Sequence, residues 1–328
     1  MTIEQRELAG TGVALTRLVL GCAPLGGLFA PVSDEDAAAT LDAAWRAGIR
    51  AFDTAPHYGV GLAEERLGAA LRSWPRAQVA VSSKVGRLLV PTDEDVDGAE
   101  GFFATPRRRR VRDDSRDGVR RSVEQSLERL GTDHLDIALV HDPDDHFAAA
   151  RDAAIPALVE LRDEGVVRAV GVGMNQTAML ERFVAETDID CVLVAGRYSL
   201  LDASAAARLF PACQARGVAV LAAGVFNSGI LADPRPGATF DYAPASADLV
   251  ERATAIRAVC ARHGVAIAAA ALHYVLAHPA VTAAVVGARS AYEVSENVRH
   301  LATPVPSELF DELEAEGLLA APVSGDRR

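Results

Sequence analysis

Short apolar runs rich in β-branched residues alternate along the chain with longer amphipathic stretches. Most of the runs are continuous, which is typical of parallel strands that are buried on both faces. The runs occupy residues 18–20, 49–52, 79–81, 137–140, 166–170, 192–194, 218–221 and 281–286. These eight strands, alternating with helices, predict a closed barrel or a doubly wound open sheet.

The stretches between the runs carry helix signals. Ser33 with Asp36 three residues later resembles a capping box, and a second helix is expected from Ser115 to a closing Gly131. No Gly-x-Gly-x-x-Gly motif opens a helix after the first strand, so the dinucleotide-binding open sheet has little support. We therefore predict a (β/α)8 TIM barrel that forms one domain over residues 1–328.

Three segments depart from this alternation. Residues 6–8 and 13–15 flank Ala9-Gly10-Thr11-Gly12, which predicts a β-hairpin ahead of the first barrel strand. Residues 86–114 and 224–248 form long loops after the third and seventh strands. Because barrels place their active sites at the carboxyl ends of the strands, we expect both loops to be functional.

Composition narrows the class of protein. Half of the 328 residues are apolar and 24% are charged, as in ordinary globular proteins, and the net charge of −12 disfavours a nucleic-acid partner. No apolar run reaches membrane-spanning length, and MTIEQREL lacks the pattern of a secretory signal, so no membrane partner is expected. The four cysteines are scattered, which fits a reducing compartment, and we expect a cytoplasmic protein. The pattern predicts no particular oligomeric state.

Four side chains with acid–base chemistry fall at the ends of three successive strands: Asp53 and Tyr58, then Lys84, then His141. A tyrosine has a pKa near 10, and a neighbouring lysine cation lowers it. An aspartate can hold that lysine, and a histidine can hydrogen-bond a substrate oxygen. Taken one at a time, these residues have simpler interpretations. Tyr58 could be a surface tyrosine, Asp53 and Lys84 a structural ion pair, and His141 a core or loop histidine. The combination favours proton transfer to or from a substrate oxygen.

The run Asp53-Thr54-Ala55-x-x-Tyr58-Gly59, then Glu64-Glu65, with Lys84 and His141 at later strand ends, resembles the signature of the aldo-keto reductase superfamily. The resemblance implies hydride transfer between a nicotinamide cofactor and a carbonyl or alcohol. It implies that Tyr58 exchanges the proton, Lys84 tunes it, Asp53 holds Lys84, and His141 orients the substrate. Further motifs, such as Phe226-Asn227-Ser228-Gly229-Ile230-Leu231, resemble the branch of aldose 1-dehydrogenases and pyridoxal 4-dehydrogenases.

The same resemblance implies a set of cofactor contacts. Asn175 stands where the family binds the nicotinamide amide, although Met174 replaces the usual serine beside it. Ala195 and Ala223 stand where relatives carry a glutamine and a stacking tyrosine. After the seventh strand, the expected contacts are Asn227, Ser228, Gly229 and Leu231. Gly229 either lets backbone amides approach a pyrophosphate or is a turn glycine.

Cofactor choice depends on the segment after the last strand. Glu296 and Asn297 resemble the adenine-binding pair, and with this alignment Gly287 and Glu293 replace the lysine and arginine of phosphate-preferring relatives. Glu293 would repel a 2′-phosphate and could accept a hydrogen bond from a ribose hydroxyl. Arg289 could restore phosphate binding, and Glu293 could simply cap the helix. The resemblance favours NAD, with NADP as the alternative.

The favoured reaction is the oxidation of a cyclic sugar at C1 to a lactone, so the partner is a small-molecule sugar or carbonyl substrate. The alternatives are NADPH-dependent reduction of aldehydes or ketones, oxidation of pyridoxal, and a redox-sensing binding subunit. The run His141-Asp142-Pro143-Asp144-Asp145-His146 suggests a metal hydrolase. No second histidine cluster ends another strand, so we expect no metal. We interpret the basic residues 107–110 as part of a solvated loop, balanced by the acidic residues 93–97.

Overall fold

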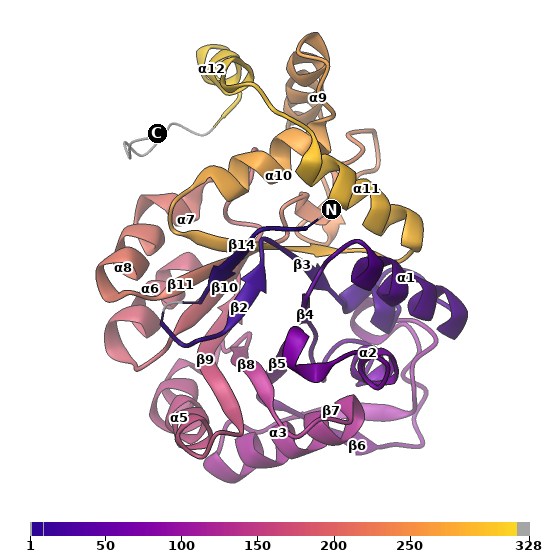
Figure 1. Ribbon diagram of the computed structural model, residues 1–328, viewed down its shortest axis with the longest axis vertical. Coiled ribbons are helices and arrows are strands. Elements are labelled where there is room, and N and C mark those ends of the chain that lie inside the picture. The colour runs from indigo at the N-terminus through magenta and orange to yellow at the C-terminus, as the bar shows by residue number, and fades with distance from the viewer. Residues whose placement is uncertain (1, 9, 320–328) are drawn as a thin grey trace.

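The barrel predicted from the apolar runs is present in the computed structural model, which describes residues 2–8 and 10–319 (Figure 1). Each strand pairs in parallel with the next, and the last strand closes the barrel on the first. The strands are β3 (Leu18–Gly21), β4 (Ala51–Asp53), β5 (Ala80–Val85), β8 (Leu135–His141), β9 (Val167–Met174), β10 (Cys191–Ala195), β11 (Ala219–Ala223) and β14 (Val281–Gly287). All eight expected runs are barrel strands, so the predicted (β/α)8 fold is confirmed.

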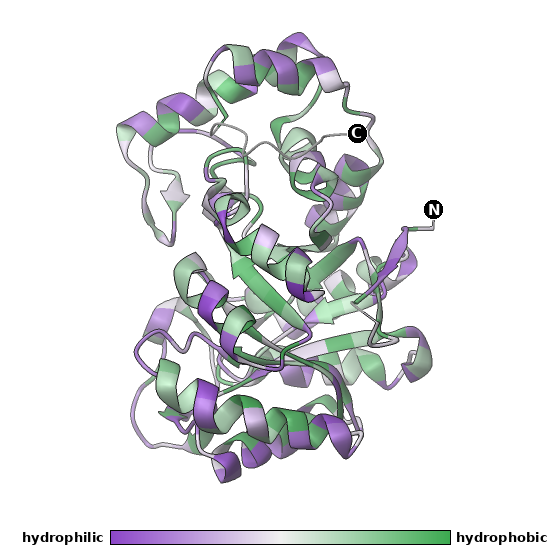
Figure 2. Ribbon diagram, turned by 90° about the vertical axis from the view of Figure 1, so that its left-hand side faces the viewer, coloured by the Kyte–Doolittle hydropathy of each residue, from purple (hydrophilic) through white to green (hydrophobic). Residues whose placement is uncertain are grey.

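Alternate residues along the strands face two different apolar layers. Val19 and Leu139 point into the barrel, whereas their neighbours Leu18, Leu20 and Val140 pack outward against the helices. Both layers exclude water, and this explains why the strands are continuous apolar runs. In Figure 2 the strands form a green centre, and the helices around them carry purple residues on their outer faces.

The helices begin where the capping residues predicted. The Ser33 Oγ accepts a hydrogen bond from the Asp36 N–H at 3.0 Å, Ser115 caps the next long helix in the same way, and Gly131 ends that helix in the left-handed conformation. The helices are α1 (Asp34–Arg46), α2 (Leu62–Leu71), α3 (Arg116–Leu130), α4 (Phe147–Ala149), α5 (Ile155–Asp163), α6 (Thr177–Glu186), α7 (Ser204–Ala207), α8 (Leu209–Arg216), α9 (Ala247–Arg262), α10 (Ile267–Ala277), α11 (Ala291–Ala302) and α12 (Ser307–Ala315). In the described part of the chain no single helix is long and apolar enough to cross a membrane, and only α9 with α10, bent by 94°, passes that test as a pair.

The N-terminal hairpin consists of β1 (Gln5–Glu7) and β2 (Ala14–Thr16), one residue away from the predicted ranges. Leu8, Val13 and Leu15 join the apolar cluster inside the barrel, so the hairpin covers the end opposite the carboxyl ends of the strands. Within the expected turn, Ala9 lies outside the described residues.

The long segments after β5 and β11 contain more structure than the sequence predicts. The first holds an antiparallel hairpin of β6 (Arg87–Pro91) and β7 (Arg108–Arg112), and the second holds a short hairpin of β12 (Thr239–Phe240) and β13 (Ala243–Pro244). The interpretation of residues 107–110 as part of a solvated loop is wrong for Arg108 and Arg110, which lie on β7 and contact the barrel, whereas Arg107 and Arg109 are exposed. Arg108 pairs with Glu65 at 2.6 Å, and the Arg110 Nη2 donates to the His57 carbonyl at 2.9 Å. Arg108 and Arg110 are thus anchored on the barrel rim and not on the acidic residues 93–97.

Candidate active site

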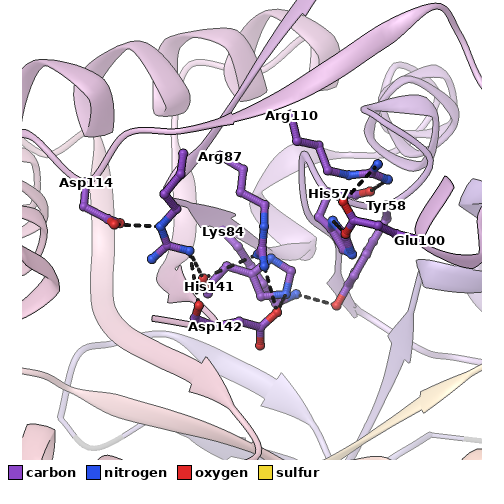
Figure 3. A network of polar contacts seen from close by, with 10 residues as sticks. His57, Tyr58, Lys84, Arg87, Glu100, Arg110, Asp114, His141 and Asp142 are labelled. Carbon is purple, nitrogen blue, oxygen red and sulfur yellow. Dashed lines mark hydrogen bonds and ion pairs between the residues drawn. The ribbon is translucent and has the colours of Figure 1, made fainter. Parts of the chain in front are cut away.

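The four residues predicted to act together meet at the carboxyl ends of β4, β5 and β8. Figure 3 shows three of them, Tyr58, Lys84 and His141. The Lys84 Nζ lies 2.7 Å from the Asp53 Oδ2 and 3.0 Å from the Tyr58 hydroxyl, and it donates a third hydrogen bond to the Thr54 carbonyl at 2.9 Å. The His141 ring stands edge-on to the Tyr58 ring, with their centroids 5.8 Å apart. The side chains therefore form one contiguous group.

Two glycines place the Tyr58 phenol over Lys84. The turn that carries Tyr58 packs directly against the backbone at Gly26, where a Cβ atom would lie 2.7 Å from the Tyr58 carbonyl carbon. A Cβ on Gly59 would lie 2.3 Å from the Gly26 oxygen. Only glycine permits this backbone approach. The glycine-rich segment after β3 thus fixes the position of the phenol.

Burial decides the electrostatics of the Tyr58–Lys84 pair. Burial lowers the pKa of Lys84, but Asp53 and Tyr58 raise it by more, so the ammonium stays charged. Burial also raises the pKa of Tyr58, and the opposing effect of Lys84 only partly offsets that rise. Lys84 acts in the predicted direction, but the phenol keeps a pKa above its ordinary value because it is enclosed.

Two histidines beside the tyrosine are held neutral. Burial lowers the pKa of His141 well below its ordinary value, and the cationic Lys84 and Arg87 add to the effect. Burial, Arg87 and Arg110 lower the pKa of His57 to about 2. The His57 ring lies 5.5 Å from the His141 ring, edge to face. The sequence analysis did not identify His57, although it lies next to Tyr58.

The β6–β7 hairpin supplies arginines to the rim that the sequence analysis also missed. Arg112 donates to the His141 carbonyl at 2.8 Å, and Arg87 pairs with Asp142 at 3.3 Å. Arg108, Arg110 and Arg112 all point toward the barrel, as alternate residues of a strand do. The spacing of two residues between these arginines is typical of one face of a strand, and this pattern in the sequence could have identified them.

The turn after β11 has features that suit an anionic cofactor. Asn227, Ser228 and Gly229 have φ values of 45°, 57° and 100°, so three successive residues are left-handed. Such backbone forms concave sites for anions. The Asn227 Oδ1 is buried without a hydrogen-bond partner among the described residues, while its Nδ2 donates to the Gly196 carbonyl at 3.2 Å. Leu231 differs from Asn227, Ser228 and Gly229. Its side chain is fully buried and its N–H donates to the Phe226 carbonyl, so it stabilises the turn from the protein interior.

The remaining expected cofactor residues lie on neighbouring rim segments. Asn175 follows β9, is half-buried, and makes no side-chain hydrogen bond to the described residues. Gly287 ends β14, and a Cβ there would lie 3.0 Å from the Pro24 ring. On α11, Glu296 pairs with Arg299, and Asn297 is buried.

Glu293 completes the start of α11. Its Oε2 accepts a hydrogen bond from the Arg289 N–H at 2.9 Å, while Ser290 caps the helix. The Arg289 side chain donates to the Leu28 carbonyl at 3.2 Å. The capping role that the sequence leaves open for Glu293 is therefore present. Because β11 and β14 are adjacent, the left-handed turn and the α11 N-terminus follow neighbouring strands, and both kinds of backbone favour anionic groups.

This arrangement is suited to acid–base chemistry. In residues 2–8 and 10–319 no group of three or more His, Cys, Asp or Glu side chains is placed to hold a metal ion. The site combines a phenol, a buried cation and a neutral imidazole. A positioned acid–base group of this kind contributes about 10²–10⁴-fold to a rate.

Comparison with known proteins agrees with the geometry. Residues 17–316 match the aldo/keto reductase family. The chain is 40% identical over 329 residues to a D-threo-aldose 1-dehydrogenase of a Pseudomonas species, covering 98% of this chain and all of that protein. It is 41% identical over 339 residues to a pyridoxal 4-dehydrogenase of Microbacterium luteolum, covering 97% and 98% of the two chains.

A solved structure has the same fold over the whole chain. An aldo-keto reductase from Bacillus halodurans, determined in its holo form, superposes with a TM-score of 0.77 at 27% identity and covers 99% of both chains. The chain therefore belongs to the aldo/keto reductase family, and it is an NAD(P)-dependent oxidoreductase.

Proposed function

We propose that this enzyme oxidises an aldose at C1 to the lactone. The observation that carries the proposal is the buried Asp53–Lys84–Tyr58 chain, with the Tyr58 hydroxyl 3.0 Å from the Lys84 Nζ. The proposal is supported by the 40% identity to a D-threo-aldose 1-dehydrogenase over nearly the full length of both proteins. Oxidation of pyridoxal is the second candidate, because a pyridoxal 4-dehydrogenase is 41% identical over a similar length.

Each residue at the carboxyl ends of β4, β5 and β8 has a separate role in this reaction. Tyr58 takes the proton from the C1 hydroxyl, and the Lys84 ammonium stabilises the phenolate that results. Asp53 keeps the ammonium in place at 2.7 Å. The neutral His141 imidazole donates a hydrogen bond to the same substrate oxygen. When bound, the nicotinamide supplies the hydride acceptor.

We further propose that NAD is preferred over NADP. Glu293 places a carboxylate at the start of α11, and the side chain of Arg289, a cation in the same segment, is bonded to the Leu28 carbonyl. A phosphate brought to this point meets like charge. The hydrogen bond from the Arg289 N–H leaves the second oxygen of Glu293 free to accept one from a ribose hydroxyl.

The test is a dehydrogenase assay of the purified enzyme with a panel of aldoses and with pyridoxal, each with NAD and with NADP, followed at the absorbance of the reduced nicotinamide. We expect aldoses to be oxidised with the highest kcat/KM, and NAD to exceed NADP. Higher efficiency with pyridoxal would favour the second candidate. Activity confined to aldehyde reduction with NADPH would contradict the proposal.

A further inference from the structure

Asp142, which directly follows His141, has an unusual backbone. Its φ is +41°, in the left-handed region that few residues other than glycine adopt. Its N–H donates to the Gly173 carbonyl on the neighbouring strand at 2.9 Å, so the bend occurs where β8 leaves the barrel. Strained backbone of this kind persists where the surroundings fix it, and it is concentrated at functional sites.

The β6–β7 hairpin holds this bend. The Arg112 Nη1 donates to the His141 carbonyl at 2.8 Å and to the Asp142 carbonyl at 3.2 Å. The Arg87 Nη1 approaches the same His141 carbonyl at 3.4 Å. Two guanidinium groups therefore fix two successive carbonyl groups, and with them the direction of the Asp142 side chain.

The bend turns the Asp142 carboxylate back over the catalytic histidine (Figure 3). Its Oδ2 lies 3.4 Å from the His141 Nε2 and 3.3 Å from the Arg87 Nη2. Its Oδ1 has no hydrogen-bond partner in the described part of the chain, and 40% of the side chain is exposed. An acceptor oxygen is thus available on the carboxylate that lies beside the His141 Nε2.

We propose that Asp142 determines substrate specificity by accepting a hydrogen bond from a hydroxyl on the carbon next to the one that is oxidised. This inference rests on the proposed function, because it places the reacting oxygen between Tyr58 and His141. The 3.4 Å between the His141 Nε2 and the Asp142 Oδ2 lets one substrate reach both groups with oxygens on adjacent carbons. The substrate class is therefore a carbonyl compound or hemiacetal with a neighbouring hydroxyl.

The pairing with Arg87 makes this selection effective. Burial raises the pKa of the Asp142 carboxyl, and the Arg87 guanidinium offsets part of that rise by stabilising the charged acceptor. A substrate without the hydroxyl takes the place of water and leaves a desolvated carboxylate oxygen unpaired. One hydrogen bond to a charged group corresponds to a preference of about 10–100-fold.

The experiment compares substrate pairs that differ only in this hydroxyl, with wild type, Asp142→Gly, Asp142→Asn and a control, Asp145→Asn. Glycine and asparagine both tolerate the left-handed backbone, so the bend is retained. Asp145 is an exposed carboxylate of the same loop. The first pair, D-arabinose and 2-deoxy-D-ribose, is oxidised with NAD. The second pair, 2-hydroxypropanal and propanal, is reduced with NADH.

We expect wild type to prefer the hydroxylated member of each pair by about 10–100-fold in kcat/KM. Asp142→Gly should bring that ratio close to one, Asp142→Asn should lower it in part, and Asp145→Asn should leave it unchanged. An equal loss on both members, or an unchanged ratio, would overturn the inference. If neither pentose is oxidised, the proposed function fails, and the aldehyde pair alone decides the role of Asp142. If the enzyme turns over neither pair of substrates, both the proposed function and the role of Asp142 are contradicted.

Discussion

The Lys84 ammonium donates a 3.0 Å hydrogen bond to the Tyr58 hydroxyl and is itself held by Asp53 at 2.7 Å, with Lys84 and Asp53 almost completely buried. A buried cation with a fixed counterion cannot move away from the phenol without leaving Asp53 unpaired. The position of the charge that stabilises the phenolate is therefore set before any substrate binds. Such preorganised charge is a main source of catalysis in enclosed sites.

Replacing Lys84 with methionine should shift the pH dependence of the oxidation. Lys84 lowers the pKa of Tyr58 against the effect of burial, so its loss raises that pKa further. Tyr58 is the base in this direction, and the rate rises with pH as the phenolate forms. The rising limb of the pH–rate profile should move to higher pH, with about 10²–10⁴-fold less activity at pH 7. The double variant Asp53→Asn/Lys84→Met controls for the unpaired aspartate, and an unmoved profile in both variants would exclude Lys84 as the tuner.

The buried histidines should make the protein less stable in mild acid. The unfolded chain takes up a proton on each histidine below about pH 6.5, whereas the pKa of His57 in the folded protein is lowered to about 2. Stability is therefore complete above pH 6.5 and is lost as the pH falls, by about 1 kcal/mol per histidine between pH 7 and pH 5.5. Urea unfolding at these two pH values should show a drop that is about 1 kcal/mol smaller for His57→Gln than for wild type. Equal drops would show that His57 takes up its proton in the folded state.

Glu64, which the family signature includes, has a structural role. It is fully buried, and its two oxygens accept hydrogen bonds from the Ser83 Oγ and the Arg129 Nε, both at 2.7 Å. Arg129→Met leaves a buried carboxylate without its cation, and we expect a loss of about 3–5 kcal/mol in the free energy of unfolding. The double variant Glu64→Gln/Arg129→Met removes the unpaired charge and should recover most of that loss. If the single and double variants are equally stable, the pair does not stabilise the fold.

Glu293→Gln tests the preference for NAD. Glutamine keeps the acceptor for the Arg289 N–H, so the start of α11 is preserved while the charge is removed. Without that charge, kcat/KM with NADP should rise relative to NAD by about tenfold, which corresponds to about 1.4 kcal/mol. Ser290→Ala, which removes the other cap of this helix, should leave the cofactor ratio unchanged. An unaltered ratio in Glu293→Gln would mean that this carboxylate does not face the ribose.

The barrel could be predicted from the sequence because its strands are buried on both sides. Runs such as residues 137–140 stay apolar whichever layer each residue faces. The β6–β7 hairpin lies outside the barrel. Its strand β7 consists of four arginines and one valine, so it has no apolar pattern. Its conformation comes from pairing with β6 and from contacts on the rim, which a local pattern does not encode.

The same distinction applies to the site. Asp53, Lys84 and His141 could be identified because each lies at or next to the end of a strand, and parallel strands bring their carboxyl ends together. The arrangement of Asp142 could not be identified, since its left-handed bend depends on Arg112, a residue thirty positions earlier in the chain. The burial of the Tyr58 hydroxyl could not be predicted from the sequence either, and this burial keeps the pKa of Tyr58 above its ordinary value.

The most direct test of the account is the turnover of Tyr58→Phe with an aldose and NAD, measured together with cofactor binding by fluorescence titration. Phenylalanine keeps the ring packed between the turn and His141 and removes only the hydroxyl bonded to Lys84. We predict a fall in kcat of about 10²–10⁴-fold, with the dissociation constant of the cofactor changed by less than about threefold. Turnover of Tyr58→Phe at the wild-type rate would contradict the assignment of Tyr58 as the group that takes the proton.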